Sequence, residues 1–177
     1  GWKVAGVTPR ETMFELAFAV RQQNLSVLED TLLMTSNPDH QKYGQHLTSQ
    51  QVHTIVAPKT SDVELVMSYF AKHNVEAECV TQNCDWIVAK NISVAKAEAL
   101  VGSGAKYQEL HHEDGHVIHR LRTKGYQLPV DLASAVDLVA PTTHIPTIRR
   151  QTKKPTRPDG FLNVPSVLRA QYSLTDT

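Results

Sequence analysis

The sequence predicts an α+β fold: a ferredoxin-like antiparallel sheet with helices on one face, followed by an extended linker. Residues 13–22 alternate apolar and polar side chains, the period of a half-buried strand. Two later pairs of strand-like segments are each joined by a short turn, which favours antiparallel hairpins. Helical patterns lie between these strands. The resulting order, β-α-β-β-α-β, is that of the split arrangement in ferredoxin-like folds.

The first half of the chain is predicted to contain one strand and three helices. Residues 1–10 show no pattern and are expected to be an irregular lead-in. Ser26 and Glu29 have capping-box spacing, which predicts a helix over 27–34 that ends at the turn residues 36–39. A short helix capped by Thr48 or Ser49 is expected to end at Pro58, and an amphipathic helix to follow over 61–72.

The second half is predicted to contain two hairpins and two short helices. Strands are expected over 75–81 and 84–92, with Trp86 in the core, and then a helix over 94–101 that ends at Gly102. Strands over 105–112 and 116–122 should turn on Asp114-Gly115, a strong hairpin signal. A final helix is expected because Leu132, Val136 and Val139 lie roughly in line at helical spacing.

Residues 141–159 form a basic, proline-rich stretch that divides the chain into a domain (1–140), an exposed linker (141–159) and the opening of a second region (160–177). The stretch contains four of the nine prolines and five of the eighteen Lys and Arg residues. Dense prolines remove backbone donors and favour extended conformations, so little packing is expected. It is either an ordinary basic linker or a processing site, because proteases cut exposed segments. The basic pairs Arg149-Arg150 and Lys153-Lys154 would suit furin-like or trypsin-like cleavage.

Composition restricts the partners more than it identifies them. Acidic and basic residues balance at 18 each, so no nucleic-acid partner is expected, and no apolar run is long enough to span a bilayer. No signal peptide is recognisable, which is uninformative for a mature chain. Glycosylation sequons begin at Asn24 and Asn91. Cys79 and Cys84 can form a disulfide across a hairpin loop or remain free thiols; the disulfide would indicate an oxidising compartment.

The sequence shows no catalytic or cofactor motif. Phosphate-binding glycine patterns and the nucleophile elbow are absent, so a small enzyme with its own site is not expected. Four of the nine histidines lie on the last hairpin: His111, His112, His116 and His119. They could bind a metal, form a solvated polar hairpin or make a pH-sensitive contact with a partner. Neighbouring strand residues point to opposite faces, so no metal site is predicted.

Several segments, in order along the chain, resemble the N-terminal propeptides of the sedolisins, the serine-carboxyl peptidases, and especially those of the animal lysosomal members. Residues 18–24 resemble the first strand and turn of these propeptides, and 36–48, with Tyr43-Gly44 and Leu47-Thr48, resemble their signature. Residues 126–129 and 136–139 match the end of the prodomain, and 164–175 resemble the first segment of the mature peptidase. The cysteine spacing and the basic linker depart from the lysosomal pattern.

This resemblance implies a function. The chain would be the propeptide of a secretory or lysosomal serine peptidase zymogen, one that releases tripeptides from free N-termini. It would assist folding of its own peptidase domain and block the cleft until self-cleavage in acid, near Asp159-Gly160. The family's catalytic residues and the calcium site belong to the peptidase domain beyond residue 177, so neither catalytic residues nor cofactors are expected here. The alternative is a free-standing secreted inhibitor or binding module acting in trans.

Overall fold

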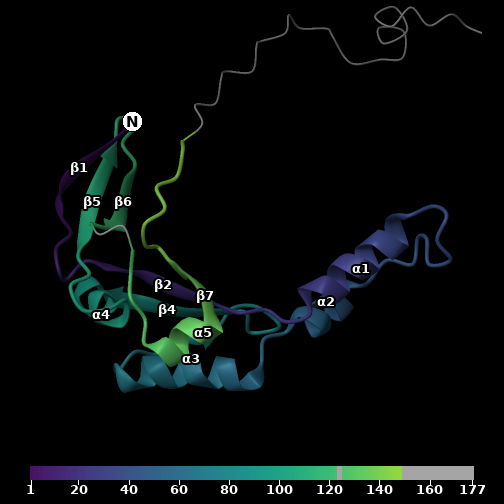
Figure 1. Cartoon of the computed structure of the whole chain (residues 1–177). Coiled ribbons are helices and arrows are strands. Elements are labelled where there is room, and N and C mark those ends of the chain that lie inside the picture. The colour runs from purple at the N-terminus through teal and green to yellow at the C-terminus, as the bar shows by residue number, and fades with distance from the viewer. Residues whose placement is uncertain (123–124, 149–177) are drawn as a thin grey trace, which may run out of the picture. The chain divides into compact units, whose positions relative to one another are not determined.

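The computed structural model describes residues 1–122 and 125–148. It confirms the α+β fold class, with antiparallel sheets, helices and an arrangement consistent with a ferredoxin-like fold (Figure 1). One compact unit spans Gly1–Ile145. The basic pairs, Asp159-Gly160 and segment 160–177 lie outside the described residues.

The main sheet has the order β3-β4-β2-β7, with β3 at Glu78–Cys79, β4 at Trp86–Ser93, β2 at Met13–Val20 and β7 at Val136–Ala140. All of its pairings are antiparallel. Phe18 of β2 pairs with Ile87 on one side and Val139 on the other, so these buried side chains share a face.

The predicted final helix is wrong in its second half. A short helix, α5 (Val130–Ala135), gives way at once to β7, so Val136 and Val139 lie on a strand. The helical spacing misled because β-branched valines suit a strand and β2 offered a hydrogen-bonding edge. Consequently the strand beside β2 is β7, and not a strand of the hairpin that turns at Asp114-Gly115. β7 is the last strand of the ferredoxin-like order.

Helices α3 (Thr60–Lys72), α4 (Val94–Leu100) and α5 cover one face of this sheet; Figure 1 shows α3 and α5 side by side against it. Their core residues Val66, Phe70, Leu100 and Leu132 are at most 1% exposed and pack with Leu16, Phe18 and Ile87. Val66 and Phe70 belong to the apolar stripe predicted for the 61–72 helix, and both face this core.

A second sheet has the order β1-β5-β6, with β5 at Tyr107–His112 and β6 at Val117–Leu121 joined by the predicted turn at Asp114-Gly115. The expectation of an irregular lead-in is wrong, because Trp2–Val7 forms β1 and pairs antiparallel with β5. All residues of β1 except Trp2 are exposed, and an edge strand without a buried face carries no alternation for sequence analysis to detect.

Helices α1 (Leu25–Ser36) and α2 (Ser49–Val56) pack together as an arm beyond the end of the main sheet (Figure 1). The predicted capping box at Ser26 is wrong. The N-cap is Asn24, in the left-handed conformation, and its side-chain amide donates to the Ile55 carbonyl of α2 at 3.0 Å. For α2 the cap is Thr48, one of the two expected, in a capping box with Gln51.

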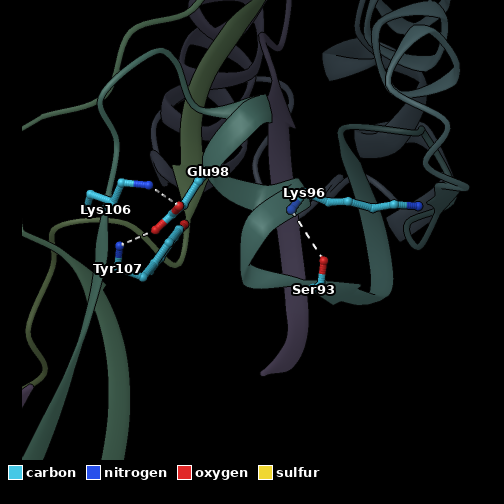
Figure 2. A network of polar contacts seen from close by, with 5 residues as sticks. All are labelled: Ser93, Lys96, Glu98, Lys106 and Tyr107. Carbon is cyan, nitrogen blue, oxygen red and sulfur yellow. Dashed lines mark hydrogen bonds and ion pairs between the residues drawn. The ribbon is translucent and has the colours of Figure 1, made fainter. Parts of the chain in front are cut away.

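A buried carboxylate connects α4 to β5 (Figure 2). The Glu98 side chain is 8% exposed; it accepts hydrogen bonds from the Tyr107 backbone N–H at 3.0 Å and from Lys106 Nζ at 2.8 Å. At the other end of α4 the Ser93 hydroxyl accepts from the Lys96 backbone N–H. The contacts of Glu98 fix the second sheet to the helical layer.

Residues 141–144, the first part of the predicted linker and here called the strap, make hydrogen bonds to the second sheet, although Thr143 and His144 are exposed. The Tyr107 hydroxyl donates to the Pro141 carbonyl at 2.8 Å, and the Leu121 N–H donates to the Thr142 carbonyl at 2.9 Å. Arg120 Nε donates to the His144 carbonyl, and Thr142 is only 5% exposed. Backbone acceptors hold the strap, and they leave no hydrophobic signal in the sequence.

Candidate functional site

The face of the main sheet opposite the helices is a candidate interface. Residues paired across an antiparallel ladder lie on the same face, so the register defines two rows of small or apolar side chains. We call this surface the open face; its members are Ala17, Ala19, Trp86, Val88, Leu138 and Ala140. Leu138 is 46% exposed, Trp86 and the alanines are half-buried, and Val88 is buried, with 8% of its surface exposed.

Trp86 therefore does not lie in the core. It pairs with Ala19 on the open face, whereas its neighbour Ile87 points to the helices and is fully buried. Alanines flanked by an indole ring and a leucine leave room for a partner to approach the sheet closely. Aromatic residues of this kind are frequent anchors of protein interfaces.

Charged pairs border the open face. Arg21, just beyond β2, pairs with Asp137 of β7 at 2.7 Å, and Lys90 of β4 pairs with Glu78 of β3. Glu78 also raises the pKa of Lys90. An apolar centre with a charged rim is the usual pattern of a protein–protein interface.

A depression of about 250 Å³ lies where the open face meets α1, and its lining includes Ala19, Trp86, Leu25 and Asp85. Asp85 is 9% exposed; Thr81 Oγ1 and Gln22 Nε2 each donate to its carboxylate at 2.6 Å. Burial alone would raise the pKa of Asp85, but the hydrogen bonds, chiefly from Thr81 and Gln22, outweigh it and lower the pKa. This carboxylate therefore stays ionised in mild acid.

Cys79 and Cys84 form a disulfide with a Cα–Cα distance of 4.9 Å. It closes the loop between β3 and β4, in which Thr81 donates to Asp85. The bond thus restrains the edge of the sheet next to Trp86.

The four hairpin histidines do not converge. His112 packs edge-on against Trp2, with ring centroids 5.0 Å apart, and lies 3.1 Å from the Asp114 carboxylate. His111 contacts Glu109 on its own strand, and His116 is exposed near the turn. No group of three or more His, Cys, Asp or Glu side chains suited to a metal occurs among residues 1–122 and 125–148.

The ring of His119 contacts Thr8 and Phe14. Its Nδ1 is 3.2 Å from Thr8 Oγ1, and its ring stacks on Phe14 with centroids 6.5 Å apart. The next residue, Arg120, holds the His144 carbonyl, and burial lowers the pKa of that guanidinium. Arg120 is thus the residue of β6 whose side chain contacts the strap, and His119 precedes it on the strand.

The two sequon asparagines are both exposed, and they differ in their surroundings. The amide nitrogen of Asn24, the atom that a glycan would occupy, donates to Ile55 and closes the root of the arm. Asn91 is exposed in the left-handed conformation on β4 and borders a wide surface depression with Lys90 and Lys96. No helix in the described part of the chain is long and apolar enough to cross a membrane.

Comparison with known proteins identifies the family. Residues 1–145 match the family described as Pro-kumamolisin, activation domain, and the chain belongs to it. The matched residues coincide with the compact unit Gly1–Ile145. The resemblance to sedolisin propeptides, which was inferred from sequence segments alone, is confirmed at the level of the family.

The similar proteins are peptidases. Tripeptidyl-peptidase 1 of Rattus norvegicus is 32% identical over 99% of this chain, and that of Bos taurus is 31% identical over 99%. The probable tripeptidyl-peptidase SED3 of Arthroderma benhamiae is 29% identical over 81% of it. The chain spans only 24% to 32% of the length of these relatives.

The open face was missed by the sequence analysis, although a signal was present. Ala17 and Ala19 occupy the non-core positions of β2, where a solvated strand face would usually carry polar residues. Small apolar residues at such positions, opposite a tryptophan, are typical of a sheet face that binds a partner.

Proposed function

We propose that this chain is the activation domain of a tripeptidyl-peptidase zymogen, a serine-peptidase precursor. In this proposal it assists folding of the peptidase part of the same polypeptide, blocks its active-site cleft and is removed by self-cleavage in acid. The observation that carries the proposal is the open face: an apolar, alanine-lined sheet surface with a charged rim in a member of an activation-domain family. Blocking a cleft stably needs an interface of at least about 1,200 Å².

The hydrogen bonds of the strap define which part of the proposed linker is fixed. Contacts up to the His144 carbonyl hold the chain on the second sheet, so residues 141–144 form the fixed part of the proposed linker. The proposed linker, 141–159, thus has a fixed first part and a basic remainder. Cleavage would fall at Arg149-Arg150, at Lys153-Lys154 or near Asp159-Gly160, ahead of the peptidase segment 160–177. N-terminal sequencing of the acid-activated product distinguishes these bonds.

The proposed compartment is the secretory pathway, ending in the lysosome or outside the cell. The Cys79–Cys84 disulfide suits an oxidising compartment, and glycosylation is proposed at Asn91 in preference to Asn24. Acid release is proposed to depend on imidazoles, which gain a positive charge below about pH 6.5.

The test is inhibition of a peptidase by the separate chain. The purified peptidase part of rat tripeptidyl-peptidase 1 would be mixed with the chain, and tripeptide release measured from pH 7 down to pH 4. We expect inhibition that weakens with acidification. Ala19→Asp, on the open face, should weaken inhibition at least tenfold, whereas Ala71→Asp on the exposed side of α3 should leave it unchanged. Absence of inhibition by the wild-type chain contradicts the proposed function, and equal effects of the two variants contradict the role of the open face.

A further inference from the structure

Helix α1 exposes an unusual amount of apolar surface. Leu25, Val27, Leu32 and Leu33 are 51% to 62% exposed, and only Thr35 is buried. By contrast, α3, a helix of similar length, buries Val66 and Phe70 almost completely. A helix with apolar residues on most sides is expected to be covered on most sides, yet α1 packs mainly against α2.

Part of this apolar surface forms a continuous stripe. Leu25 and Leu32 are seven residues apart, about two helical turns, and therefore lie on the same side of α1. Glu29 lies between them, and Leu33 borders the stripe. The adjacent carboxylate, Asp30, is about 100° further round the helix and points away from the stripe. We call Leu25, Leu32, Leu33 and Glu29 the arm surface.

The arm surface continues from the open face. Leu25, the first residue of α1, lines the same depression as Ala19 and Trp86. The root of the arm is fixed, because Asn24 donates to Ile55 and Gln23 Nε2 donates to the Ala57 carbonyl at 2.9 Å. A partner seated on the open face would therefore meet α1 at Leu25.

We propose that the arm surface is a second docking surface for the same partner, the peptidase part of the same polypeptide, and that this partner presents an apolar patch with a Lys or Arg opposite Glu29. This inference rests on the proposed function. Two observations favour the peptidase part over a second copy of this chain as the partner. The surface is continuous with the open face. In addition, the relatives carry more than two-thirds of their length outside the matched part, and a partner on the same polypeptide has a high effective concentration.

The experiment measures binding at pH 7 to the peptidase part of rat tripeptidyl-peptidase 1 with its active site covalently blocked, so that docking is read separately from inhibition. Leu32→Asp should raise the Kd at least tenfold. Its control is Val130→Asp, a change of the same kind at an 85% exposed position on α5, with an expected effect below twofold. Thermal melting of each variant checks that the fold is retained.

A charge reversal on the same helix makes the test specific. Glu29→Lys and Asp30→Lys alter net charge equally at adjacent positions. We expect Glu29→Lys to raise the Kd at least fivefold and to make it less sensitive to salt, because an attractive pair becomes repulsive. Asp30→Lys should change the Kd less than twofold.

The outcomes separate the two proposals. If the wild-type chain does not bind, the proposed function fails, and the arm surface has no such partner. If the wild type binds and Leu32→Asp binds equally well, the function stands and the arm inference is overturned. If sedimentation shows a wild-type dimer that Leu32→Asp dissociates without changing the Kd for the peptidase, the arm surface serves a second copy, and our assignment of the partner is overturned.

Discussion

Replacing Tyr107 with Phe tests whether the strap is held by the hydroxyl that reaches the Pro141 carbonyl. The ring is fully buried and packs edge-on against Phe14 with centroids 5.0 Å apart, so the substitution leaves packing intact and removes one oxygen. Burial raises the pKa of Tyr107 far above its usual value, so the hydroxyl is a neutral donor at every pH of interest. Only the 2.8 Å hydrogen bond to the strap is lost.

The expected cost follows from that geometry. A buried acceptor left without its donor costs about 1–3 kcal/mol, and Pro141 is half-buried, so water can partly replace the hydroxyl. We therefore expect the free energy of unfolding to fall by about 1 kcal/mol. For a compact unit of this size that is a fall in Tm of about 2–4 °C.

Guanidinium unfolding and native-state hydrogen exchange of the Leu121 N–H, which donates to the Thr142 carbonyl, measure the effect. Tyr43→Phe is the control, because that residue is 57% exposed. Equal stability of the two variants, together with unchanged exchange of the Leu121 N–H, would refute the reasoning that this hydroxyl holds the strap.

Three further predictions concern stability. Asp85→Asn should lower the free energy of unfolding at pH 7 by about 1.5–3 kcal/mol, since hydrogen bonds to a charged group are lost. The folded pKa of Asp85 is lowered, so its contribution is fully present above the unfolded value of about 3.9 and is lost as the pH falls through the lower folded pKa; the urea midpoints of variant and wild type should converge as the pH is lowered through this range. Gly102→Ala should cost at least about 2 kcal/mol in urea titrations, because φ is +112° and a Cβ would lie 2.6 Å from the Gln127 carbonyl oxygen. Reducing Cys79–Cys84 should cost about 2 kcal/mol, as expected for so short a loop, with unfolding followed with and without reductant.

The elements predictable from sequence are those with a periodic apolar face. The strand over 13–22 and the amphipathic helix over 61–72 appear as β2 and α3, because burying one face imposes the alternation or the helical stripe. The Asp114-Gly115 hairpin was equally predictable, since its turn chemistry is local.

The missed elements depend on partners distant in sequence. β1 is defined by its ladder with β5, about a hundred residues later, and β7 by its ladder with β2. The helix-like spacing of Leu132, Val136 and Val139 could not reveal either partner. The open face was hidden for the same reason: Trp86, Ala19 and Leu138 become neighbours only when three strands pair.

The structure separates the proposed docking surfaces from the proposed acid-sensing residues, and this gives a last prediction. The open face has no histidine among its six residues, whereas His111, His112, His116 and His119 all lie on the β5–β6 hairpin that holds the strap. Glu109 contacts His111 and lies opposite His119 in the ladder, and Asp114 contacts His112. Arg120 follows His119 on β6 and donates to its backbone carbonyl.

Replacing all four histidines with Gln should therefore leave the Kd for the blocked peptidase at pH 7 within twofold of wild type. In the full-length zymogen, the same variant should lower the pH at which the tether is cut, measured by the appearance of the shorter product on gels. The physical reason is that new positive charge beside Arg120 loosens the strap, while the open face keeps its contacts. A changed Kd with an unchanged cleavage pH would mean that the hairpin docks and does not sense acid, and the assignment of the two sheets to two roles would be wrong.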